Sequence, residues 1–240
     1  MSTMHFALIN RSKSAAITPA IVQTMALCAA YQQRAHFAPA WGFVPSNVVL
    51  GLDPAKLPDN TIAAYLLDDP DVANAGGYHD VDPHGKPYIR AFVAPYLDNG
   101  GSLLGESDSV FGALTHEICE TRLDADACDF TQMPDGRFVA REASDAVEDQ
   151  LYLIALRTGH KGYASNFLLP AWFSAKSCGP YDYLGRLTAP FTKTAGGYWI
   201  IQDAHGQAYE EFGAHMPEWR RELKMKSSAR LARRLGPVGT

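Results

Sequence analysis

Cysteine is scarce in this chain, and long apolar runs are missing from it. Its four cysteines, at positions 28, 119, 128 and 178, include no C-x-x-C pair, so we expect reduced thiols and no disulfide framework. No run approaches the ~18 apolar residues that cross a membrane, and residues 1–11 lack the apolar core of a signal peptide. We therefore expect a protein that is made and kept in the cytoplasm, without a signal peptide and without a membrane partner.

Charge is also limited, because 20% of the 240 residues are charged whereas 47% are hydrophobic. That balance is typical of a globular protein with a sizeable core, and the length allows one large domain or two small ones. Beyond residue 162, aromatic residues alternate with Pro and Gly, which predicts short strands and turns. We predict a first domain over 1–160, a β-rich subdomain packed on it over 161–204, and a C-terminal helix with a basic tail over 205–240.

The net charge of −5 is unevenly distributed along the chain. Residues 219–240 hold seven Lys or Arg and one Glu, a net charge of +6, which leaves −11 on residues 1–218. A basic tail on an acidic body predicts a surface for an acidic partner, either another copy of the chain or another assembly protein; a solvated helix without a partner is the alternative. Nucleic acid is a weaker candidate, because the acidic body repels phosphates. The residues predicted to contact the partner are Trp219, Arg220, Arg221, Lys224, Lys226, Arg230, Arg233 and Arg234.

Hydrophobic periodicity and turn residues predict a mixed order of strands and helices in the first half of the chain. The helix that starts at Thr18 has proline in its first turn. The strand at 87–95 has flanking prolines, which favour the edge of a sheet. The predicted elements are, in order, strand 4–10, helix 18–37, strand 44–50, strand 61–67, loop 76–85, strand 87–95 and helix 107–122.

The helix predicted at 107–122 has two distinct faces. Residues that recur every four positions give it an apolar stripe for a core. The stripe consists of Val110, Leu114 and Ile118. On another face His116 and Glu120 are one turn apart, so an imidazole and a carboxylate can hold the same metal ion. Glu117 could then serve as a general base on water bound to that metal, whereas an amphipathic helix with solvent-facing His and Glu is the alternative interpretation.

Residues 116–120 (HEICE) resemble the HExxH helix of zincin metallopeptidases, with Glu120 in place of the second histidine. The order of elements before them is similar to the N-terminal half of a zincin, where one helix backs a twisted mixed sheet and the metal helix lies beneath the edge strand. This resemblance implies a zincin-like α+β fold with a mixed twisted sheet, and Zn²⁺ as the metal, with another divalent metal or none left open. It also implies a downstream carboxylate ligand, as in gluzincins, for which Glu142 and Asp145 are the candidates by order; an acidic surface turn is the alternative.

A second group of ligand-type residues lies in the predicted loop 76–85. Proline and glycine are interspersed with this group, so we interpret it as a turn rather than as a metal site. The group consists of His79, Asp80, Asp82 and His84.

A longer pattern is similar to zincin-like proteins of tailed-phage and prophage structural gene clusters. It comprises HExxE, the acidic residues between 142 and 149, SNFLLPAWF at 165–173, DYLG at 182–185, AP at 189–190 and GGYWI at 196–200. The resemblance implies a structural component of a virion, whose HExxE site is a structural metal site or a relic. The alternative is an active zinc peptidase, in which His116, Glu120 and Glu142 hold Zn²⁺ and Glu117 deprotonates the bound water. A second carboxylate ligand makes that water less acidic, which favours the structural role.

Overall fold

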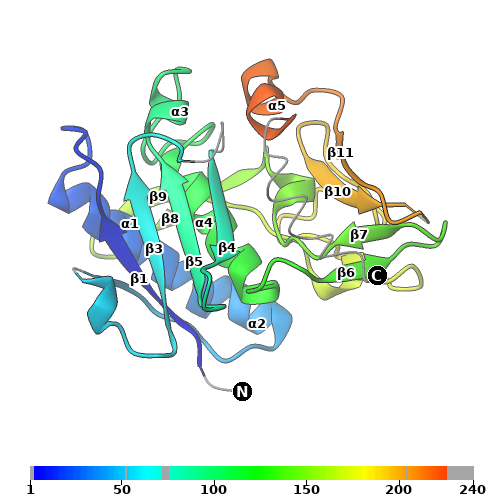
Figure 1. The fold of residues 1–240 in the computed structure, drawn as a ribbon, viewed down its shortest axis with the longest axis horizontal. Coiled ribbons are helices and arrows are strands. Elements are labelled where there is room, and N and C mark those ends of the chain that lie inside the picture. The colour runs from blue at the N-terminus through cyan, green and yellow to red at the C-terminus, as the bar shows by residue number, and fades with distance from the viewer. Residues whose placement is uncertain (1–2, 52, 72–75, 204, 226–240) are drawn as a thin grey trace.

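The structure, a computed structural model, describes residues 3–225 except 52, 72–75 and 204. Its largest sheet is mixed and five-stranded, with the order β2-β1-β3-β5-β4 (Figure 1). Four strands run parallel to one another, and β4 runs antiparallel to β5 at one edge. The strands are β1 (His5–Asn10), β2 (Val48–Leu50), β3 (Thr61–Leu67), β4 (Gly77–Val81) and β5 (Pro87–Phe92).

The first helix, α1 (Pro19–Tyr31), packs against this sheet and begins where the sequence predicts. The Thr18 side chain accepts a hydrogen bond from the Ile21 N–H, and proline occupies the first turn, where its missing N–H costs nothing. The second part of the predicted helix is the π-helix η1 (Gln32–Phe37), and the helical path continues beyond the predicted end through the short helix α2 (Ala38–Trp41).

The predicted motif helix is confirmed as α4 (Val110–Leu123). The Ser109 hydroxyl caps it by accepting a hydrogen bond from the Gly112 N–H at 3.0 Å. α4 contacts β4 and β5 of the sheet, and it also contacts β9 of a two-stranded hairpin (Figure 1). The predicted stripe, Val110, Leu114 and Ile118, is fully buried in the largest core cluster. The hairpin strands are β8 (Leu151–Ala155) and β9 (Lys161–Ser165).

A separate antiparallel sheet, with the order β11-β10-β7-β6, lies beside the first one (Figure 1). It has its own apolar cluster, which includes Trp172 and Ile201. Its strands come from both sides of residue 160, because β7 pairs with β10. Among the described residues, no helix has the length and apolarity that crossing a membrane requires. The strands are β6 (Phe130–Gln132), β7 (Phe138–Ala140), β10 (Tyr198–Gln202) and β11 (Ala208–Phe212).

The remaining elements are short. Two are helical, α3 (Ala94–Leu97) and α5 (Glu218–Met225), and three are 3₁₀ turns, η2 (Pro54–Lys56), η3 (Asp145–Val147) and η4 (Pro170–Phe173).

Two predictions about the sheet edge are wrong. Residues 76–85 are not a continuous loop, because Gly77–Val81 forms β4 and pairs with Pro87–Phe92. The edge strand is therefore β4, and β5 lies inside the sheet between β3 and β4. Pro87 is tolerated there because it is the first residue of its strand, where no ladder hydrogen bond is lost from the strand interior.

Candidate metal centre

The polar residues of α4 are as deeply buried as its apolar stripe. Every residue from 110 to 121 is buried, because the helix is covered by the sheet and by β9. A carboxylate or an imidazole in such a position requires hydrogen bonds, an ion pair or a metal. Three other segments supply the facing groups: β4, the chain after β7, and η3.

The first group of ligand atoms surrounds Nε2 of His116. This nitrogen lies 3.0 Å from Oε1 of Glu120 and 3.1 Å from Oδ1 of Asp145. The Ser144 N–H also donates a hydrogen bond to Glu120 Oε1, at 3.3 Å, and so fixes η3 against α4. All three ligand residues are buried, and one donor atom from each lies within 4.8 Å of the others. The prediction that a downstream carboxylate approaches the motif helix agrees with this arrangement.

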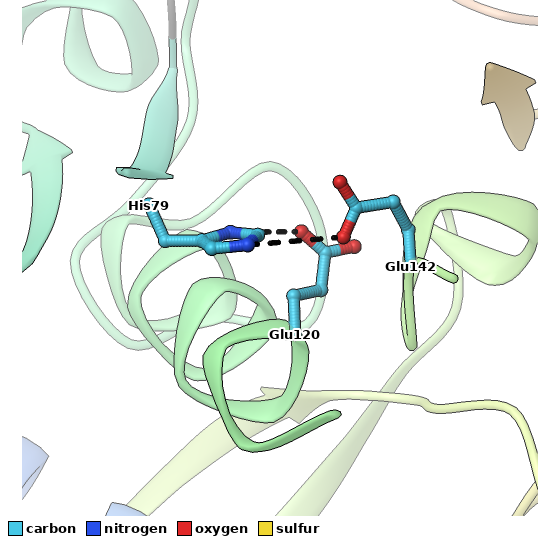
Figure 2. A group of neighbouring side chains, drawn as sticks. All are labelled: His79, Glu120 and Glu142. Atoms are coloured by element: carbon cyan, nitrogen blue, oxygen red, sulfur yellow. Dashed lines mark ion pairs between the residues drawn. The ribbon is translucent and has the colours of Figure 1, made fainter. Parts of the chain in front are cut away.

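The second group surrounds His79 of β4 (Figure 2). Its Nδ1 lies 3.1 Å from Oε2 of Glu117 and 3.7 Å from Oε2 of Glu120. Its Nε2 lies 3.1 Å from the carbonyl oxygen of Asp124 and 4.0 Å from Oε2 of Glu142. His79, Glu120 and Glu142 form a second set of buried potential ligands, and Glu120 belongs to both sets.

The residues present fit a divalent cation. Asp145 is buried, and its Oδ2 has no hydrogen-bond partner among the described residues, so one carboxylate oxygen is available to a ligand. Each set combines one imidazole with two carboxylates. Such donors suit Zn²⁺, and a set rich in oxygen also suits Mn²⁺ or Fe²⁺.

The surroundings of His116 favour the charged form of the ring, in which both nitrogens carry a proton. Burial of the ring by itself lowers the pKa, but the charge of Glu120 and the hydrogen bonds with Asp145 and Glu120 outweigh this and hold the pKa well above 6.5. A cation that binds at Nε2 must displace the proton on that nitrogen. Metal binding at His116 therefore weakens as the pH falls.

The four predicted ligands, His116, Glu120, Glu142 and Asp145, all lie in this centre, with the predicted base Glu117 beside them. Sequence reasoning missed His79, which it assigned to a turn. A hairpin signal was present, since Asp-Pro-His-Gly at 82–85 is flanked on both sides by residues that favour strands. The other members of that group belong to none of the three ligand sets, and His84 is exposed at the hairpin turn.

The predicted partner residues are divided between two environments. Trp219 packs edge-on against Tyr96, and buried Arg220 forms ion pairs with Asp108 and Glu148 of its own chain. These contacts anchor α5, so Trp219 and Arg220 contribute to the chain's own packing. Arg221 is exposed. Lys224 lies in α5, in a stretch whose side chains are not described, and Lys226, Arg230, Arg233 and Arg234 lie outside the described residues.

The group Asp124, Cys128 and Asp129 is a third possible set of ligands, at the C-terminal end of α4. It differs from the other two because Cys128 and Asp129 are exposed and because backbone N–H groups already donate hydrogen bonds to both oxygens of Asp124, at 3.2 and 2.8 Å.

No protein-family model, curated protein or solved structure matches this chain.

Proposed function

We propose that this chain is a metal-binding scaffold protein in which His116, Glu120 and Asp145 hold a divalent cation in a structural role. One observation carries the proposal: an imidazole nitrogen and two carboxylate oxygens converge within 4.8 Å in a site closed to solvent. Structural metal sites are closed, whereas catalytic sites keep a position for substrate or water. A cation here would link α4 to η3 across the intervening strands β6 and β7.

A zincin-like fold is part of this proposal. Its support is the mixed sheet with one antiparallel edge strand, the helix α1 on the sheet, and the position of α4 against β4 and β5. These features agree with the arrangement that the resemblance to zincins implies. Under this proposal the HExxE helix keeps its ligand function while the second histidine is replaced by a carboxylate.

Elemental analysis of the purified protein tests the metal proposal. We expect at least one equivalent of a divalent metal per chain at neutral pH or above, because one imidazole and two carboxylates offer donor atoms within 4.8 Å of one another. His116→Ala should lose that metal. His84→Ala is the matched control, because His84 is exposed and belongs to none of the ligand sets, and it should retain the metal. Absence of metal from a wild-type protein reconstituted with Zn²⁺ and Mn²⁺ would refute the proposal.

An active zinc peptidase is the second candidate, and one observation favours it. Glu117 lies directly beneath the edge strand, since a Cβ on Gly77 of β4 would meet the Glu117 side chain at 3.3 Å. An edge strand has free N–H and C=O groups that can pair with an extended peptide. A carboxylate below that strand is placed to take a proton from an attacking water. Burial of Glu117 opposes this role, because water and substrate must reach a general base.

Glu117→Gln separates the two candidates. The amide has nearly the same shape but cannot take a proton, so a peptidase would lose nearly all its activity while its metal content stays unchanged. We expect no cleavage of a peptide library by either protein. Cleavage by the wild type, lost in the variant, would establish the peptidase and overturn the structural role.

We further propose that the chain is a component of a large assembly, of the kind found in phage virions, and that its basic end contacts a neighbour. Support comes from the +6 charge of residues 219–240 and from the contacts of Trp219 and Arg220, which fix the start of this segment on the body. Opposite charges would attract the segment to the acidic body of another copy.

Deletion of residues 226–240 should leave a folded monomer that no longer associates. The wild-type association should weaken with salt, because exposed charges are screened over ~8 Å at physiological ionic strength. Analytical ultracentrifugation at several salt concentrations measures both effects, and circular dichroism checks the fold of the deletion variant. Equal association of the two proteins would exclude residues 226–240 as the contact surface.

A further inference from the structure

The two oxygens of Glu120 face different histidines. Oε1 lies 3.0 Å from Nε2 of His116, and Oε2 lies 3.7 Å from Nδ1 of His79. The two rings come from different elements, α4 and β4, and approach the carboxylate from separate directions. Each oxygen of Glu120 thus lies beside a different set of possible metal ligands, which is the arrangement of a carboxylate that bridges two cations.

The ring of His79 is oriented for ligation. A carbonyl oxygen can only accept a hydrogen bond, so the 3.1 Å contact with the Asp124 carbonyl places the N–H on Nε2. Nδ1 lies on the side of Glu117 and Glu120, so it is the ring nitrogen that a cation among these carboxylates would bind. Histidines that bind metals usually donate their other N–H to a carbonyl or a carboxylate, which fixes the tautomer in this way.

We propose that the centre holds two divalent cations, with His79 and Glu142 completing a second position and Glu120 bridging the pair. This inference rests on the proposed metal site at His116. Neighbouring ligands of a tetrahedral ion lie ~3.4 Å apart, from metal–ligand distances of ~2.0–2.2 Å. Nδ1 of His79 lies 3.7 Å from Oε2 of Glu120, and one donor atom from each of His79, Glu120 and Glu142 lies within 4.8 Å of the others, so a cation among them requires only small movements of these side chains.

Charge matching supports two cations rather than one. Four buried carboxylates gather here, and buried charges are stable only when paired or bound to a metal. The carboxylates are Glu117, Glu120, Glu142 and Asp145. Two divalent cations with two neutral imidazoles match these four negative charges. The cations would be held from four segments of the chain, with Glu117 next to the second position at 3.1 Å from His79.

Zinc stoichiometry tests the second position. The chain is saturated with Zn²⁺ and dialysed, and zinc per chain is measured in a Cys128→Ser background, which removes the exposed thiol of the third ligand group. We expect two equivalents of zinc per chain in the Cys128→Ser protein. Adding His79→Gln or Asp145→Asn to that protein should each reduce the zinc content to one equivalent. His84→Gln, at an exposed histidine, should retain two. One equivalent of zinc in the Cys128→Ser protein would overturn the second cation position and leave the proposed function intact. No bound zinc in that protein would overturn both.

Electron paramagnetic resonance of the Mn²⁺-loaded protein tests the bridge. Two Mn²⁺ ions that share the Glu120 carboxylate are exchange-coupled, so the spectrum should differ from that of isolated Mn²⁺. In His79→Gln the coupling should disappear and the spectrum of an isolated ion should remain. A wild-type protein with two equivalents of Mn²⁺ and no coupling would overturn the bridging role of Glu120. The wild-type spectrum decides this even if a variant fails to fold.

Discussion

Removal of the bound metal with a chelator is expected to lower the melting temperature of the wild-type chain by about 5–10 °C. A ligand that binds only the folded state stabilises it by about 2.7 kcal/mol when its concentration is 100 times the dissociation constant. In a chain of this length, 1 kcal/mol shifts the melting temperature by about 2–4 °C. Differential scanning fluorimetry with and without a chelator measures the shift, and added Zn²⁺ should reverse it.

The same measurement on His116→Ala identifies the site responsible. This variant lacks one ligand of the His116 set, so the chelator should change its melting temperature by much less than that of the wild type. His84→Ala should respond like the wild type, because its exposed imidazole lies outside the centre. If a wild-type protein with measured metal melts at the same temperature after chelation, the cation does not link α4 to η3 in a stabilising way.

Leu114→Ala is expected to reduce the free energy of unfolding by about 2–5 kcal/mol. Leu114 is 0% exposed and belongs to the apolar face of α4 in the main core. Removing its side chain loses the transfer free energy of the methyl groups and leaves a cavity, because the sheet and β9 hold α4 on both sides. Urea unfolding followed by circular dichroism measures the change.

Leu153→Ala is the matched control for this substitution. Leu153 lies in β8 and is 49% exposed, so the same chemical change should cost much less than at Leu114. Similar losses at both positions would show that α4 is not packed in the core as described. The metal centre would then lose its structural basis, since His116 and Glu120 depend on the same helix.

The sequence was sufficient to predict the elements with strong periodicity. Strand 61–67 matches β3 at both ends, and the motif helix matches α4 within three residues at its start. Glu142 and Asp145 were predicted from their order alone, and both lie at the centre. The helix is covered on both sides, however, whereas an amphipathic pattern predicts one polar face in solvent. The polar face of α4 can be buried because polar side chains of β4, η3 and the chain after β7 lie against it. The local sequence of the helix does not reveal these distant partners.

β4 could not be predicted from hydrophobic alternation. Tyr78, His79 and Asp80 are all buried, although two of them are polar. A half-buried strand normally alternates apolar and polar residues, because one face packs on the core and the other faces water. Here His79 faces the carboxylates of α4 instead of an apolar core. The polar character of His79 made β4 resemble a loop in the sequence, yet a polar side chain is what this position facing α4 requires.

The parallel pairing in the main sheet also has a consequence for the order of folding. Phe6 pairs with Ile62, and Ala63 pairs with Tyr88, so long stretches of chain must be closed into loops before these strands meet. Such pairing is slow, whereas the β4–β5 and β8–β9 hairpins are local and can form early. The metal donors come from His79 through Asp145 and converge only when α4 is docked. Under the proposed metal-binding function a cation would bind late, and it should act mainly by slowing unfolding rather than by accelerating folding.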